Sequence, residues 1–115
     1  MKKKHPITLL LILLFCSCSP KIASYVNKDY PALKYDEKVE VFGLNEPPPD
    51  NAIQVGTVEI RDTGFSVKCN YEIVLDQAKL EARRVGGNVI KIIKHKKPDF
   101  WSTCHRLDAI ILKLK

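Results

Sequence analysis

The chain has 115 residues, of which 45% are hydrophobic and 28% are charged, and its formal net charge is +6. That length leaves room for one domain. Three of the basic residues, Lys2 to Lys4, precede an apolar stretch near the N-terminus. Without them, 16 basic residues stand against 13 acidic ones, a net charge of +3 that gives no ground for nucleic-acid binding.

Residues 1–17 have the order of a secretory signal peptide: positive charge, an apolar stretch from Ile7 to Phe15, then small residues. The apolar stretch is too short for a permanent membrane helix. The small residues before Cys18 resemble a lipobox, where lipoprotein signal peptidase cleaves before a cysteine that carries diacylglycerol. Phe15 departs from the enteric pattern, which prefers Leu there. We therefore predict lipid attachment at Cys18, and the alternative is an ordinary secretory peptide with chance cysteines.

Residues 18–36 are predicted to be the lipidated N-terminus and a polar tether, because they show no sustained apolar period. Several acyl chains on Cys18 would give stable anchoring, since a single chain binds membranes only marginally. Tyrosines recur at every fifth position in this segment. We interpret them as part of a linker that lies on the domain or at the lipid interface, with a recognition strip as the alternative.

Cysteine use points to a disulfide in the exported chain. Of four cysteines, Cys16 leaves with the signal peptide and Cys18 is lipidated, so Cys69 and Cys104 remain. Two cysteines of an exported protein are expected to join in an oxidising compartment. The chain-entropy model, which is disputed, gives a loop of this length a stabilisation of about 4 kcal/mol.

Residues 37–115 are predicted to form a single α+β domain. Alternation of apolar residues indicates a strand at Val39–Phe42 and a second strand at Ile53–Arg61. Three consecutive prolines, 47–49, fix an extended loop between the two strands. The apolar phase of the second strand changes beside Gly56, which predicts a β-bulge there.

The segment from Tyr71 to Val85 predicts a helix, because its apolar residues recur at steps of three and four. Asn70 can cap its start, and the pair Gly86–Gly87 can end it. Ile73 and Leu80 lie on the opposite side. We expect the tether or the proline loop to cover them, and a small partner contact is the alternative.

Two strands follow the helix. Val89–Ile93 is apolar on both faces apart from Lys91, which predicts a central strand, and Leu107–Leu114 predicts the last strand. The order strand, strand, helix, strand, strand predicts one helix packed on a mostly antiparallel sheet, with one disulfide as a staple.

The sequence contains no nucleophile elbow, phosphate loop or paired His–Glu metal helix, so we predict no enzyme and no cofactor. One group of residues combines zinc-ligand chemistry: Cys69, His95, Asp99, Cys104 and His105. Their spacing is not that of a zinc finger, and export favours the disulfide, so we predict no metal ligands. A redox or metal-handling protein that uses the two cysteines is the alternative function.

A basic loop with two aromatic residues is the predicted contact surface. Such a run is usually a solvated face, and its alternative role is contact with lipid A phosphates or anionic headgroups near the anchor. The aromatic residues could sit at an interface or close the core. The residues are Lys91, Lys94, His95, Lys96, Lys97, Phe100 and Trp101.

Several short motifs together resemble a known family. The first three are Gly56-Thr57-Val58 on a strand, Cys69 just before the helix, and the segment Ala82 to Gly87, which closes that helix into Val89-Ile90. They are followed by His95, by Cys104-His105-Arg106 and by an apolar terminal strand. Residues 52–115 thereby resemble the soluble domain of the outer-membrane stress-sensor lipoprotein of the Rcs phosphorelay. They also resemble small Bacteroidota lipoproteins of unknown function.

The resemblance implies a Cys69–Cys104 disulfide and a periplasmic domain that signals through protein partners. The sensor's second disulfide has no counterpart here, because Lys96 and Ile110 stand near its positions, and the sensor's proline-rich stalk is longer. Ser19 after the lipidated cysteine fits outer-membrane sorting. The sequence thus predicts a lipid-anchored, non-enzymatic envelope protein that binds or senses an envelope partner.

Overall fold

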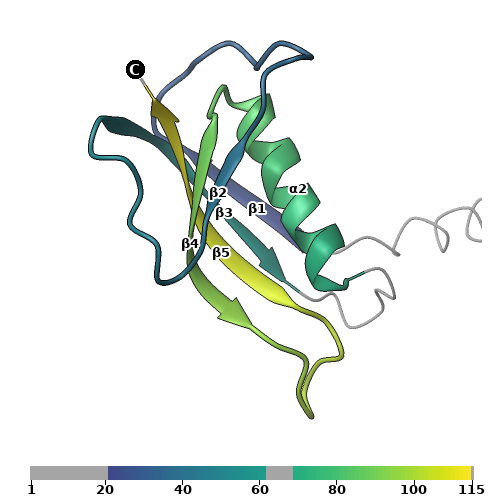
Figure 1. Cartoon of the computed structure of the whole chain (residues 1–115). Helices are drawn as coiled ribbons and strands as arrows, with labels where there is room; N and C mark the ends of the chain where they lie inside the picture. The colour runs from purple at the N-terminus through teal and green to yellow at the C-terminus, as the bar shows by residue number, and fades with distance from the viewer. Residues whose placement is uncertain (1–20, 62–68, 115) are drawn as a thin grey trace, which may run out of the picture.

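The computed structural model describes residues 21–61 and 69–114 (Figure 1). The predicted signal peptide and the lipid site at Cys18 lie outside these residues. One helix packs on a five-stranded, mostly antiparallel sheet, which confirms the predicted α+β class and adds a strand to it. The elements are β1 (Lys21–Val26), β2 (Glu40–Phe42), β3 (Ala52–Arg61), α2 (Tyr71–Arg84), β4 (Val89–Lys96) and β5 (Arg106–Leu114).

The strand order in the sheet is β1-β3-β5-β4-β2. The central strand β5 runs antiparallel to both β3 and β4, while β1 pairs antiparallel with β3 at one edge. At the other edge β2 pairs parallel with β4. The apolar run at the start of β4 therefore has a neighbour on each side, an inner position that explains why both of its faces are hydrophobic.

Strand β1 corrects the interpretation of residues 21–26 as part of a tether. These residues pair with β3 from Lys21 opposite Arg61 to Val26 opposite Gly56. The apolar residues of an edge strand stay partly exposed, as Ile22 and Val26 do, so the sequence carried little pattern to reveal it. Between β1 and β2, residues 27–39 form no strand and remain a connecting segment.

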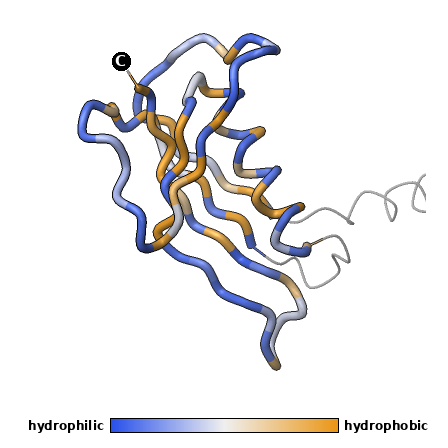
Figure 2. The backbone as a smooth tube through the Cα atoms, in the orientation of Figure 1, coloured by the Kyte–Doolittle hydropathy of each residue, from blue (hydrophilic) through white to orange (hydrophobic). Residues whose placement is uncertain are grey.

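The main core lies between α2 and the sheet, where Figure 2 shows apolar residues gathered. The helix buries Val74, Ala78 and Ala82. These small side chains let the helix approach the sheet closely. On the sheet, the largest fully buried side chains of the core cluster are Ile60, Ile90, Leu107, Ile111, Val55 and Val58.

The predicted ends of the helix are confirmed. The Asn70 side chain accepts a hydrogen bond from the Ile73 amide at 2.9 Å. At the other end Gly86 has φ +86°, and the Gly87 amide donates to the Ala82 carbonyl at 2.8 Å. This left-handed turn satisfies helix carbonyls that would otherwise lack donors.

The cover expected over the outer side of α2 does not form over Leu80, whose side chain is 64% exposed. Ile73 is half-buried. The segment 27–39 crosses the C-terminal end of the helix instead, where the Leu33 amide donates to the Arg83 carbonyl at 2.9 Å.

The sheet face opposite α2 is covered over one half. Val89 and Leu112 are register partners on this face, and both are buried outside the helix-side core. The loop between β2 and β3, which contains the three prolines, lies on this side of the sheet (Figure 1). The Lys91 ammonium holds the loop by donating to the carbonyls of Gly43, Leu44 and Glu46. The other half of this face is open.

Candidate functional site: the basic end of the open sheet face

A bulge in β4 decides which side chains face the open half. The register pairs Ile92 with Ala109 and then Lys94 with Asp108, so Ile93 is the extra residue. With regular alternation and no bulge, Lys94 would lie two positions after Ile92 and would point, as Ile92 does, toward the helix side. The bulge instead brings Lys94 and Lys96 onto the open face, as bulges commonly redirect side chains.

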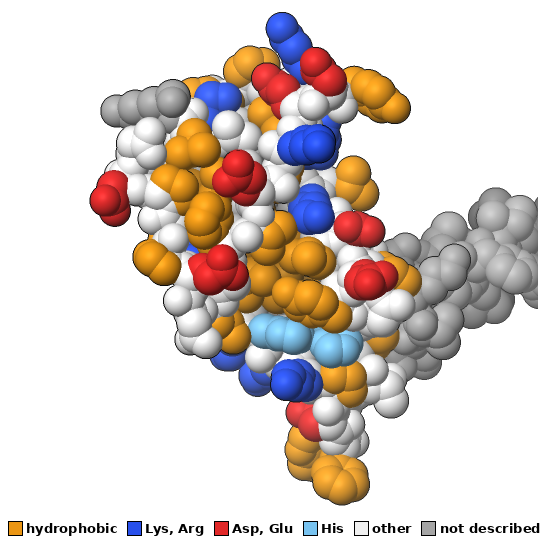
Figure 3. All heavy atoms as spheres, viewed as in Figure 1, with side chains coloured by type: hydrophobic (Ala, Val, Ile, Leu, Met, Phe, Trp, Pro, Cys, Tyr) orange, Lys and Arg blue, Asp and Glu red, His pale blue; other side chains and the backbone are white. Residues whose placement is uncertain are grey.

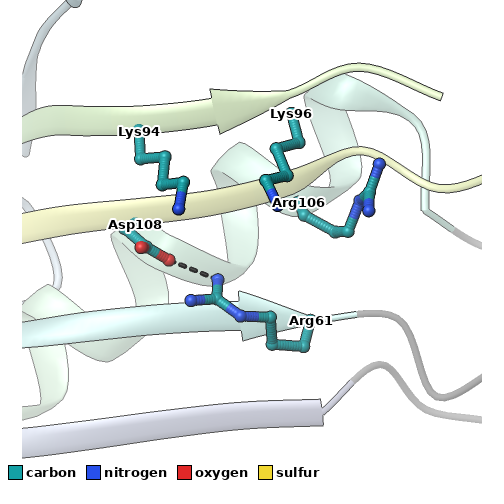
Figure 4. A pocket seen from close by; sticks show the side chains of 5 residues that line it. All are labelled: Arg61, Lys94, Lys96, Arg106 and Asp108. Atoms are coloured by element: carbon teal, nitrogen blue, oxygen red, sulfur yellow. Dashed lines mark hydrogen bonds and ion pairs between the residues drawn. The ribbon is translucent and has the colours of Figure 1, made fainter. Parts of the chain in front are cut away.

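A pocket of about 110 Å³ lies on this open half (Figure 4). Three neighbouring strands supply its walls, and four of its five lining side chains are cationic. They are Arg61 from β3, Lys94 and Lys96 from β4, and Arg106 and Asp108 from β5. We call this group the basic pocket.

The single carboxylate of the basic pocket is already paired. Asp108 accepts a hydrogen bond from the Arg61 guanidinium, and this bond raises the pKa of Arg61. Arg61 also lies 3.8 Å from the Glu59 carboxylate. The charge of Arg61 is therefore largely compensated within the protein.

The other cations keep binding capacity. Lys94 and Lys96 form no ion pair with any residue that the structure describes. Arg106 uses one nitrogen, Nη2, on the Asp99 carboxylate at 3.0 Å and on the Lys97 carbonyl at 3.1 Å. Its Nε is buried and has no hydrogen-bond partner among the described residues. Two ammonium groups without ion pairs, projecting from one strand into the same pocket, favour the binding of an anion.

The hairpin between β4 and β5 extends beyond the basic pocket and is ordered by Asp99. Its Oδ1 accepts from the amides of Trp101 and Ser102 at 2.9 and 3.0 Å. The hydrogen bond from Arg106, followed by the one from the Trp101 amide, lowers the pKa of Asp99. A carboxylate thus fixes the turn and joins it to the pocket through Arg106.

The tip of this hairpin presents two aromatic side chains to solvent. Phe100 is 105% exposed and Trp101 is 92% exposed, so neither closes the core, which was one of the two roles considered from the sequence. Apolar side chains are visible at the end of the hairpin, at the bottom of Figure 3. These two adjacent exposed aromatic side chains make the hairpin tip a candidate interaction site.

A histidine pair lies on the helix side, close to the same end of the sheet. His95 Nε2 and His105 Nδ1 are 2.9 Å apart, and the ring of Tyr71 packs on both imidazoles. Burial lowers the pKa of His95, and the charges of His105 and Lys97 lower it further. The two side chains appear side by side in pale blue in Figure 3.

The cysteines form the predicted disulfide, which joins the segment before α2 to the segment before β5. Cys69 is 7% exposed and Cys104 is 1% exposed. Among the residues that the structure describes, no three potential metal ligands gather. The five residues considered for zinc are divided between this disulfide, the histidine pair and the hairpin turn.

The predicted contact surface is thus partly redistributed. Lys94, Lys96, Lys97, Phe100 and Trp101 lie at the basic pocket or on the hairpin. His95 points to the helix side, and Lys91 serves the β2–β3 loop. The sequence reasoning missed three pocket residues, Arg61, Arg106 and Asp108. Polar residues at alternate positions of β5 were the available signal for the last two.

No family model, no curated protein and no solved structure matches this chain. Within residues 21–61 and 69–114, no helix has the length and apolar character needed to cross a membrane.

Proposed function

We propose that this protein is a lipid-anchored protein of the cell envelope, attached at Cys18, whose domain is a non-enzymatic module that binds an anionic group in the basic pocket. The observation that carries the binding role is the charge state of that pocket. Two ammonium groups and a buried guanidinium nitrogen have no partner among the described residues, while the only lining carboxylate is paired.

The anchor and the location are supported by the signal peptide, the lipobox and the disulfide. A buried disulfide suits a chain that folds outside the cytosol, where thiols oxidise. Ser19 after Cys18 supports an outer-membrane location with the domain in the periplasm. The likeness of residues 52–115 to the stress-sensor lipoprotein extends the proposal to stress sensing through an envelope protein partner.

A binding role suits the pocket chemistry better than catalysis. Its unpaired cations are the two lysines Lys94 and Lys96, which attract an anion. The carboxylate that could transfer a proton is held as the partner of Arg61. The redox and metal alternative gains no support, because both cysteines are joined in the buried disulfide.

The proposal is tested by titrating residues 19–115, produced with the disulfide formed, with tripolyphosphate and following backbone amide shifts by NMR. This segment contains every strand, the helix and the disulfide described above. We expect amide shifts at the end of β3, at the end of β4 and at the start of β5. Binding of tripolyphosphate should be at least about tenfold weaker in the Lys94→Gln/Lys96→Gln double variant.

The matched control is Lys79→Gln on α2, which removes one positive charge away from the pocket. Equal binding by the double variant and the wild type, or shifts spread evenly over all lysine-bearing surfaces, would contradict the proposed site.

A further inference from the structure

Three features that are distant in the sequence meet at one end of the sheet. The ladder pairs Lys21, the first residue of β1, with Arg61, the last residue of β3. At the same end Lys96 pairs with Arg106, where the β4–β5 hairpin begins. The start of β1, the basic pocket and the aromatic hairpin tip therefore share this end (Figure 1).

The chain length before β1 places the predicted anchor at this end as well. Cys18 precedes Lys21 by three residues, and an extended chain covers at most about 3.6 Å per residue, so their separation is at most about 11 Å. Because residues 21–26 are a strand of the sheet, the anchor cannot be separated from the domain by the long tether that the sequence suggested for residues 18–36. An acylated Cys18 would hold this end of the sheet at the bilayer surface.

We infer that this end of the domain docks on an anionic bilayer surface, with Phe100 and Trp101 at the interface and the basic pocket on headgroup phosphates. The inference rests on the proposed function and names the anionic ligand as a lipid headgroup. Aromatic residues favour the boundary between headgroups and acyl chains, and lysines near an anionic surface strengthen attachment. Both kinds of residue are present here in one place.

The hairpin is built to present its tip. Asp99 fixes the turn through two backbone amides, and its other oxygen pairs with Arg106 of the basic pocket. The aromatic tip therefore keeps a fixed position relative to the basic pocket. Two exposed aromatic rings on a projecting tip can insert into a bilayer interface, where they gain apolar contacts. A small soluble phosphate bound in the basic pocket would make no contact that explains these rings.

The single tryptophan of the chain provides the test, because Trp101 stands at the tip itself. Residues 19–115 are mixed with vesicles of phosphatidylcholine alone or with phosphatidylglycerol added, and Trp101 emission and co-sedimentation are measured. We expect a blue shift and sedimentation with the anionic vesicles. The Lys94→Gln/Lys96→Gln variant is expected to partition more weakly by about fivefold per lysine.

Two further variants sharpen the readout. Phe100→Ser removes apolar area from the tip, keeps the tryptophan reporter and touches no buried residue, so it should reduce partitioning without loss of fold. Lys79→Gln on α2 should partition as the wild type does. Circular dichroism and thiol alkylation confirm that each variant is folded and disulfide-bonded.

The outcomes separate this inference from the proposed function. Tripolyphosphate binding in the basic pocket without a blue shift on anionic vesicles overturns membrane docking and leaves the anion-binding role standing. A blue shift of equal size on neutral vesicles also overturns the inference, since the headgroup charge would then be irrelevant. Absence of both responses removes the proposed anion-binding role together with the inference.

Discussion

Gly87 shows how a single residue fixes the packing between α2 and β5. A Cβ atom at this position would lie 2.2 Å from Ile111 Cγ2 and 3.1 Å from the Leu112 carbonyl oxygen. Both neighbours belong to the central strand, and Ile111 is fully buried. Neither can therefore shift without a substantial cost in packing free energy.

We therefore expect Gly87→Ala to lower the free energy of unfolding by about 2–3 kcal/mol, as overpacking does in cores. Urea denaturation measures this change. The matched control is Gly43→Ala, where the new Cβ would meet only the flexible end of the Glu46 side chain at 3.0 Å. A control variant as destabilised as Gly87→Ala would contradict the packing argument.

His95 gives the domain a predictable response to pH. Its pKa in the fold lies below the usual 6.5, chiefly because of burial. As the pH falls through 6.5, the unfolded chain therefore takes up the proton more readily than the folded one. Stability is fully present above this value and decreases toward the lower pKa of the folded state.

We expect the Tm to be lower at about pH 5.5 than at about pH 7.5, and this difference to shrink in His95→Gln. Differential scanning calorimetry at the two pH values measures both effects. Carboxylates titrate equally in the wild type and the variant, which makes the variant its own control. An unchanged pH difference in His95→Gln would remove this histidine from the explanation.

Some residue roles could be predicted and others could not, for a physical reason. The Asn70 cap and the Gly86 helix end follow from local chemistry, and both are confirmed. The role of Lys91 depends on a loop 45 to 48 positions away, whose carbonyls it binds. No local pattern carries that information, so a lysine that holds a loop was assigned to a contact surface.

At the scale of elements, Arg83 ties the segment 27–39 to the helix. Its guanidinium donates to the carbonyls of Lys34 at 2.6 Å, Tyr35 at 3.4 Å and Glu37. These bonds satisfy backbone acceptors of a segment that has no strand of its own.

We predict that Arg83→Ala loosens this segment, at a cost of about 1–2 kcal/mol in unfolding free energy. Hydrogen exchange should accelerate in residues 33–38. The control is Arg84→Ala, whose guanidinium pairs with Glu81 on the same helix and should cost less than about 0.5 kcal/mol. Unchanged exchange in the Arg83 variant would show that other contacts hold the segment.

The two bulges illustrate how far a sequence predicts an element. In β3 the change of apolar phase predicted a bulge beside Gly56, and the register shift lies between Gln54 and Gly56, next to that position. In β4 the run from Val89 to Ile93 is apolar on both faces. It therefore has no alternation of apolar and polar residues whose change could reveal a bulge. The shift at Ile93 is visible only in the pairing with β5, and it creates the basic pocket.

At the scale of the whole molecule, the sequence predicted the class, the helix, four strands and the disulfide. The fifth strand, β1, depends on the free edge of β3, whose paired residues lie 30 to 40 positions away in the sequence. Gly56 permits this pairing, because a Cβ there would lie 2.3 Å from the Tyr25 carbonyl oxygen. With β1 in place, only three positions of the sequence separate the predicted anchor at Cys18 from the first strand.

The most direct test of the account is the mass of the N-terminal peptide of the protein isolated from membranes of an expressing bacterium. We predict a chain that begins at Cys18 and carries diacylglycerol on its thiol, and loss of membrane association in Cys18→Ala. An unmodified N-terminus at any other residue would contradict the lipid anchor, and with it the orientation of the basic end toward the bilayer.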